Sequence, residues 1–247
     1  MKKSVSLIIS AYNEEKNIQA AIESADDLMR NTTDDYELLV FNDGSQDQTG
    51  VIADRLAKTN RHIRVVHNPG NRGISYIARK GIEIASKDYV TWFPGDNGID
   101  KESMKPVIKA IGSADIIVSY IANRQCRALG RRILSWTFTT SMNLIFGLRL
   151  KYYNGPTVYP TRLLKPLKMT SQGFEFFAEL LIRFLKSGGY SYVEIPFFIP
   201  PTDPQGRSKA VSWKNVKSIW KTTNILIRDI YAPRMPKIFQ ETSKSHV

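Results

Sequence analysis

The sequence lacks most of the features that would place it outside the cell or across a bilayer. Its single cysteine, Cys126, excludes an internal disulfide and a cysteine-based zinc site, so a reducing, cytosolic setting fits best. The apolar run after Lys2 and Lys3 is too short for a secretion signal. The longest uncharged stretch in the basic middle, residues 133–148, has 16 residues and includes six Ser, Thr or Asn. This is too short and too polar for a spanning helix, so we expect no membrane crossing.

Acidic residues are missing from one long segment. Residues 116–174 contain no Asp or Glu but nine Lys or Arg, and the whole chain has a formal net charge of +12 at pH 7. Such an imbalance favours an anionic partner: nucleic acid, a phosphate-bearing substrate or an anionic membrane surface. No nucleic-acid-binding module is visible and the cations alternate with aliphatic runs, so nucleic acid is not an expected partner.

The glycine-rich phosphate-binding fingerprints are absent as well. The first apolar run is followed by AYNEE, which has no glycine, and no GxxxxGK[ST] occurs anywhere in the chain. These absences argue against a dinucleotide-dependent dehydrogenase and against a P-loop enzyme.

What the chain does contain is a repeated pattern of short apolar runs, polar turns and amphipathic segments. The pattern predicts strands near residues 5–11, 36–41, 63–67, 89–93 and 115–120, with helices between them. This alternation is typical of an α/β fold with a mainly parallel sheet covered by helices on both faces. Ligands of such sheets bind beyond the carboxyl ends of the strands, so the polar turns there form the candidate site.

Carboxylate and amide side chains follow the first two predicted strands. Asn13 and Glu14 follow the first, and Asp43 and Ser45 follow the second. Carboxylates can accept hydrogen bonds from the imino and hydroxyl groups of a nucleoside. The alternative is that the Asn-Asp-Gly-Ser turn only caps the next helix.

Together, the ordered motifs SLIISAYNEEKNI, ELLVFNDGSQDQT and HNPGNRGISYIARKGIEIASKDYVTWFPGDN resemble those of the family 2 glycosyltransferases. GFEFFAELLIRFLKSGGYSYVEIPF and the later GRSK are similar to the dolichol-phosphate mannosyltransferase branch. The resemblance covers about residues 4–209. It implies a GT-A type fold, a nucleoside-diphosphate sugar donor, and inverting sugar transfer, commonly onto a polyprenyl phosphate at the cytosolic face of a membrane.

The resemblance also implies roles for individual residues. Asp96 matches the second acid of the metal-binding DXD motif and so implies Mg²⁺ or Mn²⁺, although Pro94 stands in place of the first acid. Lys209 matches a lysine of the family's mobile loop, where a cation can pair with phosphate charge. The alternative for Pro94 to Gly98 is a plain tight turn, and for Lys209 a solvated lysine. The positions that match the nucleoside-binding turns are Tyr12, Asn13, Glu14, Asn42, Asp43 and Ser45, followed by Asn71 and Gly73. Among them, Asn42 stands where the family usually has an acid.

The acceptor decides whether a general base is needed. A lipid phosphate is already anionic near neutral pH, whereas a hydroxyl must lose a proton. Glu175 is the predicted catalytic acid or base of the downstream helix, with Glu179 one turn further on. Either carboxylate can instead be solvated or salt-bridged. Two alternative functions remain: a soluble glycosyltransferase that uses a saccharide hydroxyl, and a nucleotide-sugar-binding relic without activity.

We expect a single GT-A type domain over residues 1–232, followed by a tail at 233–247. Residues 1–120 form the nucleotide-sugar half, 121–210 the acceptor half, and 211–232 a basic amphipathic helix. Helices expected near 128–148 and 211–231 combine tryptophan with cations, which is typical of peripheral attachment to an anionic membrane on its cytosolic face. A membrane-anchoring subunit is a further expected partner. The alternative is that three tryptophans pack in the core or against another subunit: Trp136, Trp213 and Trp220.

Overall fold

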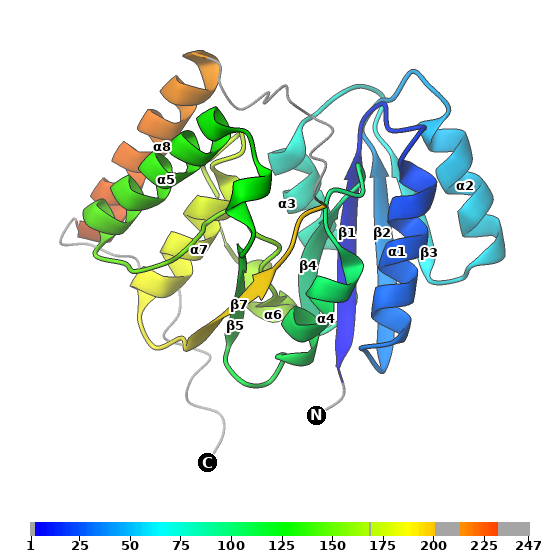
Figure 1. Cartoon of the computed structure of the whole chain (residues 1–247), viewed down its shortest axis with the longest axis horizontal. Coiled ribbons are helices and arrows are strands. Elements are labelled where there is room, and N and C mark those ends of the chain that lie inside the picture. The colour runs from blue at the N-terminus through cyan, green and yellow to red at the C-terminus, as the bar shows by residue number, and fades with distance from the viewer. Residues whose placement is uncertain (1–2, 168, 201–212, 232–247) are drawn as a thin grey trace.

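A computed structural model of the chain describes residues 3–167, 169–200 and 213–231, with the side chains of 213–216 outside that description (Figure 1). The main sheet has five strands in the order β3-β2-β1-β4-β6. The first four are parallel, and β6 is antiparallel to β4. A second, two-stranded parallel sheet pairs β5 with β7. The strands are β1 (Ser4–Ala11), β2 (Asp35–Asn42), β3 (Ile63–His67), β4 (Tyr89–Pro94), β5 (Ile116–Ile121), β6 (Tyr159–Pro160) and β7 (Tyr192–Phe197).

The central strand β1 is apolar along most of its length because helices cover both faces of the sheet. Val5, Leu7 and Ile9 join one hydrophobic cluster, while Ile8 points to the other. This alternation follows the two-residue period of a strand. Both clusters draw on residues before and after position 120, so the two predicted halves share their cores.

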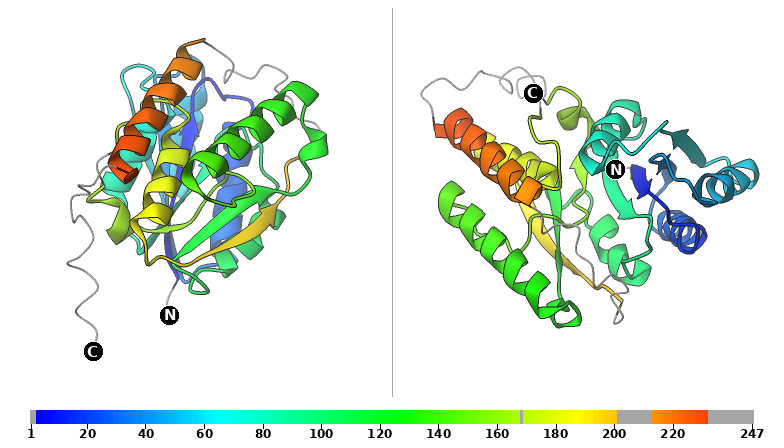
Figure 2. Two further views of the ribbon diagram at one scale, coloured as in Figure 1. Left: turned by 90° about the vertical axis from the view of Figure 1, so that its left-hand side faces the viewer. Right: turned by 90° about the horizontal axis from the view of Figure 1, so that it is seen from above.

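Helices cover the sheet in two layers (Figure 2). One face packs against α1 (Ile18–Arg30), α2 (Thr49–Thr59) and α4 (Lys101–Lys109). The other packs against α3 (Ile74–Ile84), and its cluster continues into α5 (Leu129–Phe146), α7 (Phe176–Ser187) and α8 (Trp213–Tyr231). The short helices η1 (Arg124–Cys126) and α6 (Thr161–Leu164) complete the described elements. The α/β architecture predicted from the sequence is therefore confirmed.

The sequence predicts one mainly parallel sheet, whereas the structure has two sheets. The strand expected at residues 115–120 forms as β5, but it pairs with β7 and not with the main sheet. A single antiparallel bridge between Ile117 and Val158 links β5 to the segment that becomes β6. Because β6 has only two residues, it shows no alternating pattern in the sequence, and the prediction missed it.

The strand register positions the functional edge. Ala11 lies opposite Asn42, Asn42 opposite His67, and Ser10 opposite Pro94. The carboxyl ends of β1 to β4 are therefore level, and the loops that follow them leave the sheet at one edge. Among the described residues, no helix is both long enough and apolar enough to cross a bilayer.

Candidate active site

The loops that follow β1 and β2 are hydrogen-bonded to each other. The Asn13 amide donates to Ser45 Oγ at 3.0 Å, and the Gln46 amide donates back to Asn13 Oδ1 at 2.9 Å. The Glu14 amide donates to Thr49 Oγ1 at 2.8 Å. Asn13 adopts a left-handed conformation with φ of 56°, which asparagine tolerates better than most residues. The structure thus brings Asn13, Glu14 and Ser45 together, as the sequence predicts.

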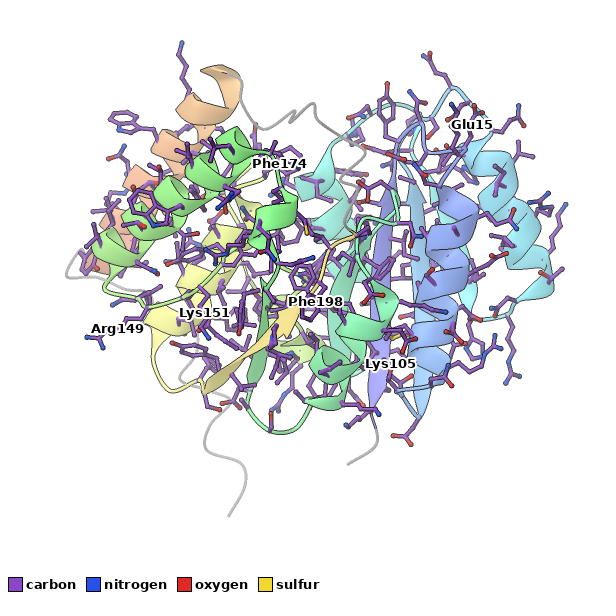
Figure 3. All side chains as sticks on the ribbon, in the orientation of Figure 1. Glu15, Lys105, Arg149, Lys151, Phe174 and Phe198 are labelled. Atoms are coloured by element: carbon purple, nitrogen blue, oxygen red, sulfur yellow. The ribbon has the colours of Figure 1, made fainter. Side chains whose placement is uncertain are left out.

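This loop pair continues through Glu15, which Figure 3 shows at the same edge of the molecule. The Glu15 amide donates to Asp47 Oδ2 at 3.1 Å, and the Gln48 amide donates to Glu15 Oε2 at 3.1 Å. Partial burial would raise the pKa of Asp47, but hydrogen bonds from Thr49 and the Glu15 amide outweigh it and lower the pKa. The Asp47 carboxylate therefore fixes this loop pair while keeping its charge.

Asp43 is the most heavily used of the predicted binding residues. It is buried, and it accepts hydrogen bonds from Asn68 Nδ2 at 2.7 Å and from the amides of Arg72 and Gly73 at 2.9 Å. A carboxylate has about four lone-pair positions, so these three hydrogen bonds leave one acceptor position of Asp43 unused. The loop that Asp43 holds contains Asn71, whose side chain is exposed, and Gly73, whose φ of 82° favours glycine.

Both the nitrogen and the oxygen of the Asn42 side-chain amide make hydrogen bonds to neighbouring residues. Its Nδ2 lies 3.0 Å from His67 Nδ1, and its Oδ1 accepts from the Ser45 amide at 3.2 Å. His67 Nε2 in turn lies 3.0 Å from Asp54 Oδ1. Asn42 therefore ties β2 to β3 and to the Ser45 turn. Tyr12, at the end of β1, keeps an exposed ring at this edge.

Asp96 lies in the turn that follows β4, beside the end of β1. The Gly95 amide donates to the Ser10 carbonyl at 3.0 Å, and Asp96 Oδ1 accepts from the Gly98 amide at 2.9 Å. Asn97 has a left-handed φ of 54°, and its Oδ1 is buried without a hydrogen-bond partner. Within the described residues, no group of three or more His, Cys, Asp or Glu could hold a metal ion. One carboxylate and one unpaired amide oxygen fit a cation that takes its other ligands from a diphosphate and water.

The edge extends to the second sheet. The Asp100 amide donates to the Phe198 carbonyl at 3.1 Å, and the Ile199 amide donates to Asn123 Oδ1 at 3.0 Å. The segments that follow β5 and β7 therefore meet the start of α4, just after the Asp96 turn. Phe198 is labelled at this junction in Figure 3.

Directly after Asn123 comes a set of cations that we call the basic cluster, made of Arg124, Arg127 and Lys151. Arg127 Nη1 donates to Tyr152 Oη at 3.3 Å, and Lys151 Nζ lies 4.3 Å from the centroid of the Tyr120 ring. Arg124 donates to the Lys151 carbonyl. Aromatic and main-chain contacts thus hold the basic cluster beyond the end of β5.

Glu175, predicted as a catalytic residue, is buried at the start of α7. Its Oε1 accepts from the amides of Gln172 and Gly173, at 3.3 and 3.1 Å, and from Ser218 Oγ at 2.6 Å. These bonds serve the first turn of α7 and its contact with α8. The proposed role of Glu175 in proton transfer stays a prediction.

Glu179 is fully buried and salt-bridged, as one of the alternatives predicted. It accepts from the Thr170 and Ser171 amides, at 3.0 and 2.8 Å, and from Arg183 Nε at 2.8 Å. Burial alone would raise its pKa, but these hydrogen bonds and the Arg183 charge outweigh it and lower the pKa. Arg183 also donates to Asp229 Oδ2 at 3.0 Å, which ties α7 to α8. Glu179 is therefore held as a charged scaffold group.

Lys209 lies outside the described residues. Asn68, which the sequence analysis missed, is the side-chain donor that holds Asp43, and its position directly after β3 was the available signal. A cavity of about 790 Å³ opens at the opposite edge of the sheet beside Lys87 and Asp115, and is not part of this site.

Two proteins of known sequence are similar to this chain over part of their length. The uncharacterized glycosyltransferase EpsJ of Bacillus subtilis is 39% identical over 93 residues, which cover 38% of this chain and 26% of EpsJ. The dodecaprenyl-phosphate galacturonate synthase of Rhizobium johnstonii is 24% identical over 176 residues, covering 70% of this chain and 52% of that enzyme. The chain thus spans about a quarter to a half of these relatives.

The crystal structure of glucosyl-3-phosphoglycerate synthase from Mycobacterium tuberculosis, in complex with Mn²⁺, uridine diphosphate and glucosyl-3-phosphoglycerate, has a similar fold. The TM-score is 0.63 at 18% identity, covering 92% of this chain and 79% of that one. The sequence profile described as Glycosyl transferase family 2 matches residues 6–165. With its strand-end loops and its Asp96 turn at one edge of a GT-A type sheet, the chain belongs to glycosyl transferase family 2.

Proposed function

We propose that the protein transfers a sugar, with inversion, from a nucleoside-diphosphate sugar to a polyprenyl phosphate at the cytosolic face of a membrane. One observation carries the proposal: the level ends of β1, β2 and β4 bring the loops around Asp43 and Asp96 to the same edge. That edge is where ligands of parallel α/β sheets bind.

The donor side of the site has groups that suit the nucleoside and the diphosphate of a nucleotide sugar. The open acceptor position of Asp43 suits an imino or hydroxyl donor of the nucleoside, and the exposed ring of Tyr12 suits stacking on the base. Asp96 and Asn97 Oδ1 would hold Mg²⁺ or Mn²⁺ together with the diphosphate. When bound, such a cation neutralises the charge that develops on the leaving diphosphate.

The acceptor side favours a phosphate over a hydroxyl. A hydroxyl acceptor needs a base, but Glu179 is ion-paired and Glu175 is buried under three hydrogen bonds. A lipid phosphate needs no base, and the basic cluster beyond β5 complements its charge. The relative from Rhizobium johnstonii, by its name, makes a dodecaprenyl-phosphate sugar.

The reaction is an in-line displacement. A phosphate oxygen of the acceptor forms a bond to the anomeric carbon, while the bond from that carbon to the donor diphosphate breaks on the opposite side. The bonding electron pair leaves with the nucleoside diphosphate, and the sugar changes its anomeric configuration. The contribution of the chain is to align the two phosphates on either side of the sugar and to offset their negative charge.

The test offers labelled UDP- and GDP-sugars together with detergent-dispersed polyprenyl phosphate or soluble saccharides, with and without Mn²⁺. We expect label in the lipid fraction, and Asp96→Asn should lower this transfer by about a hundredfold or more. Asp88→Asn is the matched control, because Asp88 precedes β4 at the opposite edge of the sheet and should leave transfer unchanged.

Two results would contradict the proposal. Label on saccharides alone would show a hydroxyl acceptor. Nucleotide-sugar binding in a thermal-shift assay without release of nucleoside diphosphate to any acceptor would show a binding protein without transferase activity.

A further inference from the structure

Helix α5 carries large apolar side chains on two sides, one buried and one exposed. Met142 and Phe146 are buried, but Trp136 is 62% exposed and Leu144 is 79% exposed. A surface helix that meets only water usually turns polar residues to its exposed side. The predicted alternative, that Trp136 packs in the core, is wrong within this chain. The exposed apolar residues of α5 are spaced so that four of them lie on one side of the helix: Leu129, Ile133, Trp136 and Leu144.

Helix α8 repeats this arrangement. Trp220 is 72% exposed, whereas Leu226 is buried in the cluster that includes the apolar residues of α7. Ile227 and Tyr231 are exposed as well, at the spacing that places them on the same side as Trp220. Core packing is therefore wrong for Trp220 too, while the side chain of Trp213 lies outside the described residues.

The two helices form one side of the molecule. Tyr231 Oη donates to the Ile145 carbonyl at 2.9 Å, and the Tyr231 ring stacks on Phe146. Figure 2 shows α5 and α8 on either side of α7, on the side away from β3. Since both helices turn their buried residues toward the cluster of α7, their exposed residues face outward. We call the exposed set the apolar face: Leu129, Ile133, Trp136, Leu144, Trp220, Ile227 and Tyr231.

Positive charge surrounds the apolar face. Helix α5 contains no acid, and the one acid of α8, Asp229, is paired with Arg183 at 3.0 Å. Figure 3 shows Arg149 projecting from the end of this side. Tryptophan and leucine next to cations are the composition of surfaces that enter the headgroup region of anionic bilayers. The exposed cations are Arg132, Arg149, Lys217, Lys221 and Arg228.

We propose that the apolar face docks on an anionic lipid surface, with its hydrophobic residues in the headgroup boundary and its cations on lipid phosphates. A second copy of the chain is a poorer occupant, because a symmetric contact would place two basic rims against each other. The apolar face begins at Leu129, two residues after Arg127 of the basic cluster. The proposal therefore deepens the proposed function, on which it rests for the membrane setting, by naming the surface that meets the lipid, and its test needs neither donor nor acceptor.

The test measures flotation of the full chain with vesicles, without nucleotide sugar or polyprenyl phosphate. We expect binding to phosphatidylcholine vesicles with about 30% phosphatidylglycerol, and little binding to pure phosphatidylcholine. Raising the salt from about 50 mM to about 500 mM should weaken binding several-fold. Leu144→Asp should lower the partition coefficient by about tenfold or more, since it removes an apolar group and adds a repelled charge.

Val51→Asp is the matched control, because Val51 is an apolar residue of α2, 64% exposed, and α2 lies at the other end of the molecule. It should bind vesicles like the unmodified chain, and circular dichroism should show both variants folded. Equal binding by Leu144→Asp and Val51→Asp would overturn the proposal. So would an unmodified chain that ignores vesicles but forms dimers which Leu144→Asp dissociates. Transfer measured with detergent-dispersed acceptor is independent of both outcomes, so failure of docking and failure of the proposed function are distinguishable.

Discussion

At the scale of single residues, Asp43 holds the loop that follows β3 through three hydrogen bonds to its carboxylate. Asp43→Asn replaces an acceptor by an NH₂ group that faces backbone donors, so we expect a loss of about 1–3 kcal/mol in the free energy of unfolding. Donor affinity should fall about tenfold or more, because the loop at residues 68–73 loses its anchor. Urea unfolding and calorimetric titration with a nucleotide sugar measure the two effects.

Asp35→Asn is the control for this change, since Asp35 begins the strand that Asp43 follows and is exposed, with Lys87 as its ion-pair partner. We expect less than about 1 kcal/mol and no change in donor affinity. Unaltered donor binding by Asp43→Asn would refute the role given to this carboxylate.

The sequence predicted Asp43 and Asn13 as site residues because polar side chains at the ends of parallel strands converge. It did not predict that the Asn42 side chain would be hydrogen-bonded to His67, since that contact depends on the register of β2 against β3. Side-chain partners 25 residues apart leave no local pattern.

At the scale of elements, the joint between α7 and α8 depends on a buried charge. Since the folded-state pKa of Glu179 lies below its unfolded value, its contribution to stability is present above the unfolded pKa and is lost as the pH falls through the folded pKa. Glu179→Gln should therefore lower the unfolding free energy by about 2 kcal/mol near neutral pH. The difference from the unmodified chain should shrink below about pH 4.

Urea unfolding across this pH range tests the prediction, with Glu83→Gln as control because its pair with Lys80 is exposed. That control should change stability by less than about 1 kcal/mol. A Glu179→Gln effect that is constant with pH would contradict the electrostatic explanation.

Elements were predictable where the pattern is long. The helix at 129–146 follows from its spacing of apolar residues, yet the same spacing could not say whether those residues face the core or solvent. The pairing of β5 with β7, two strands separated by 70 residues of intervening chain, depends on tertiary packing that no local pattern encodes.

At the scale of the whole molecule, the free energy of local opening should differ from one region of the chain to another. Strand β1 is flanked by β2 and β4 and lies between two hydrophobic clusters, so its amides should exchange with solvent most slowly. In residues 129–138 no side chain is buried, so this half of α5 should exchange much faster. Hydrogen exchange read by mass spectrometry checks both, and anionic vesicles should slow exchange in α5 and α8 but not in α2. Equal protection of β1 and residues 129–138 would refute this picture.

The position of α5 and α8 on one flank has a consequence for turnover. An enzyme lying on a bilayer meets an acceptor embedded there by searching a plane and not a volume. The rate would then follow the number of acceptor molecules per unit area of lipid, and diluting them with inert lipid would slow the enzyme even at constant total amount.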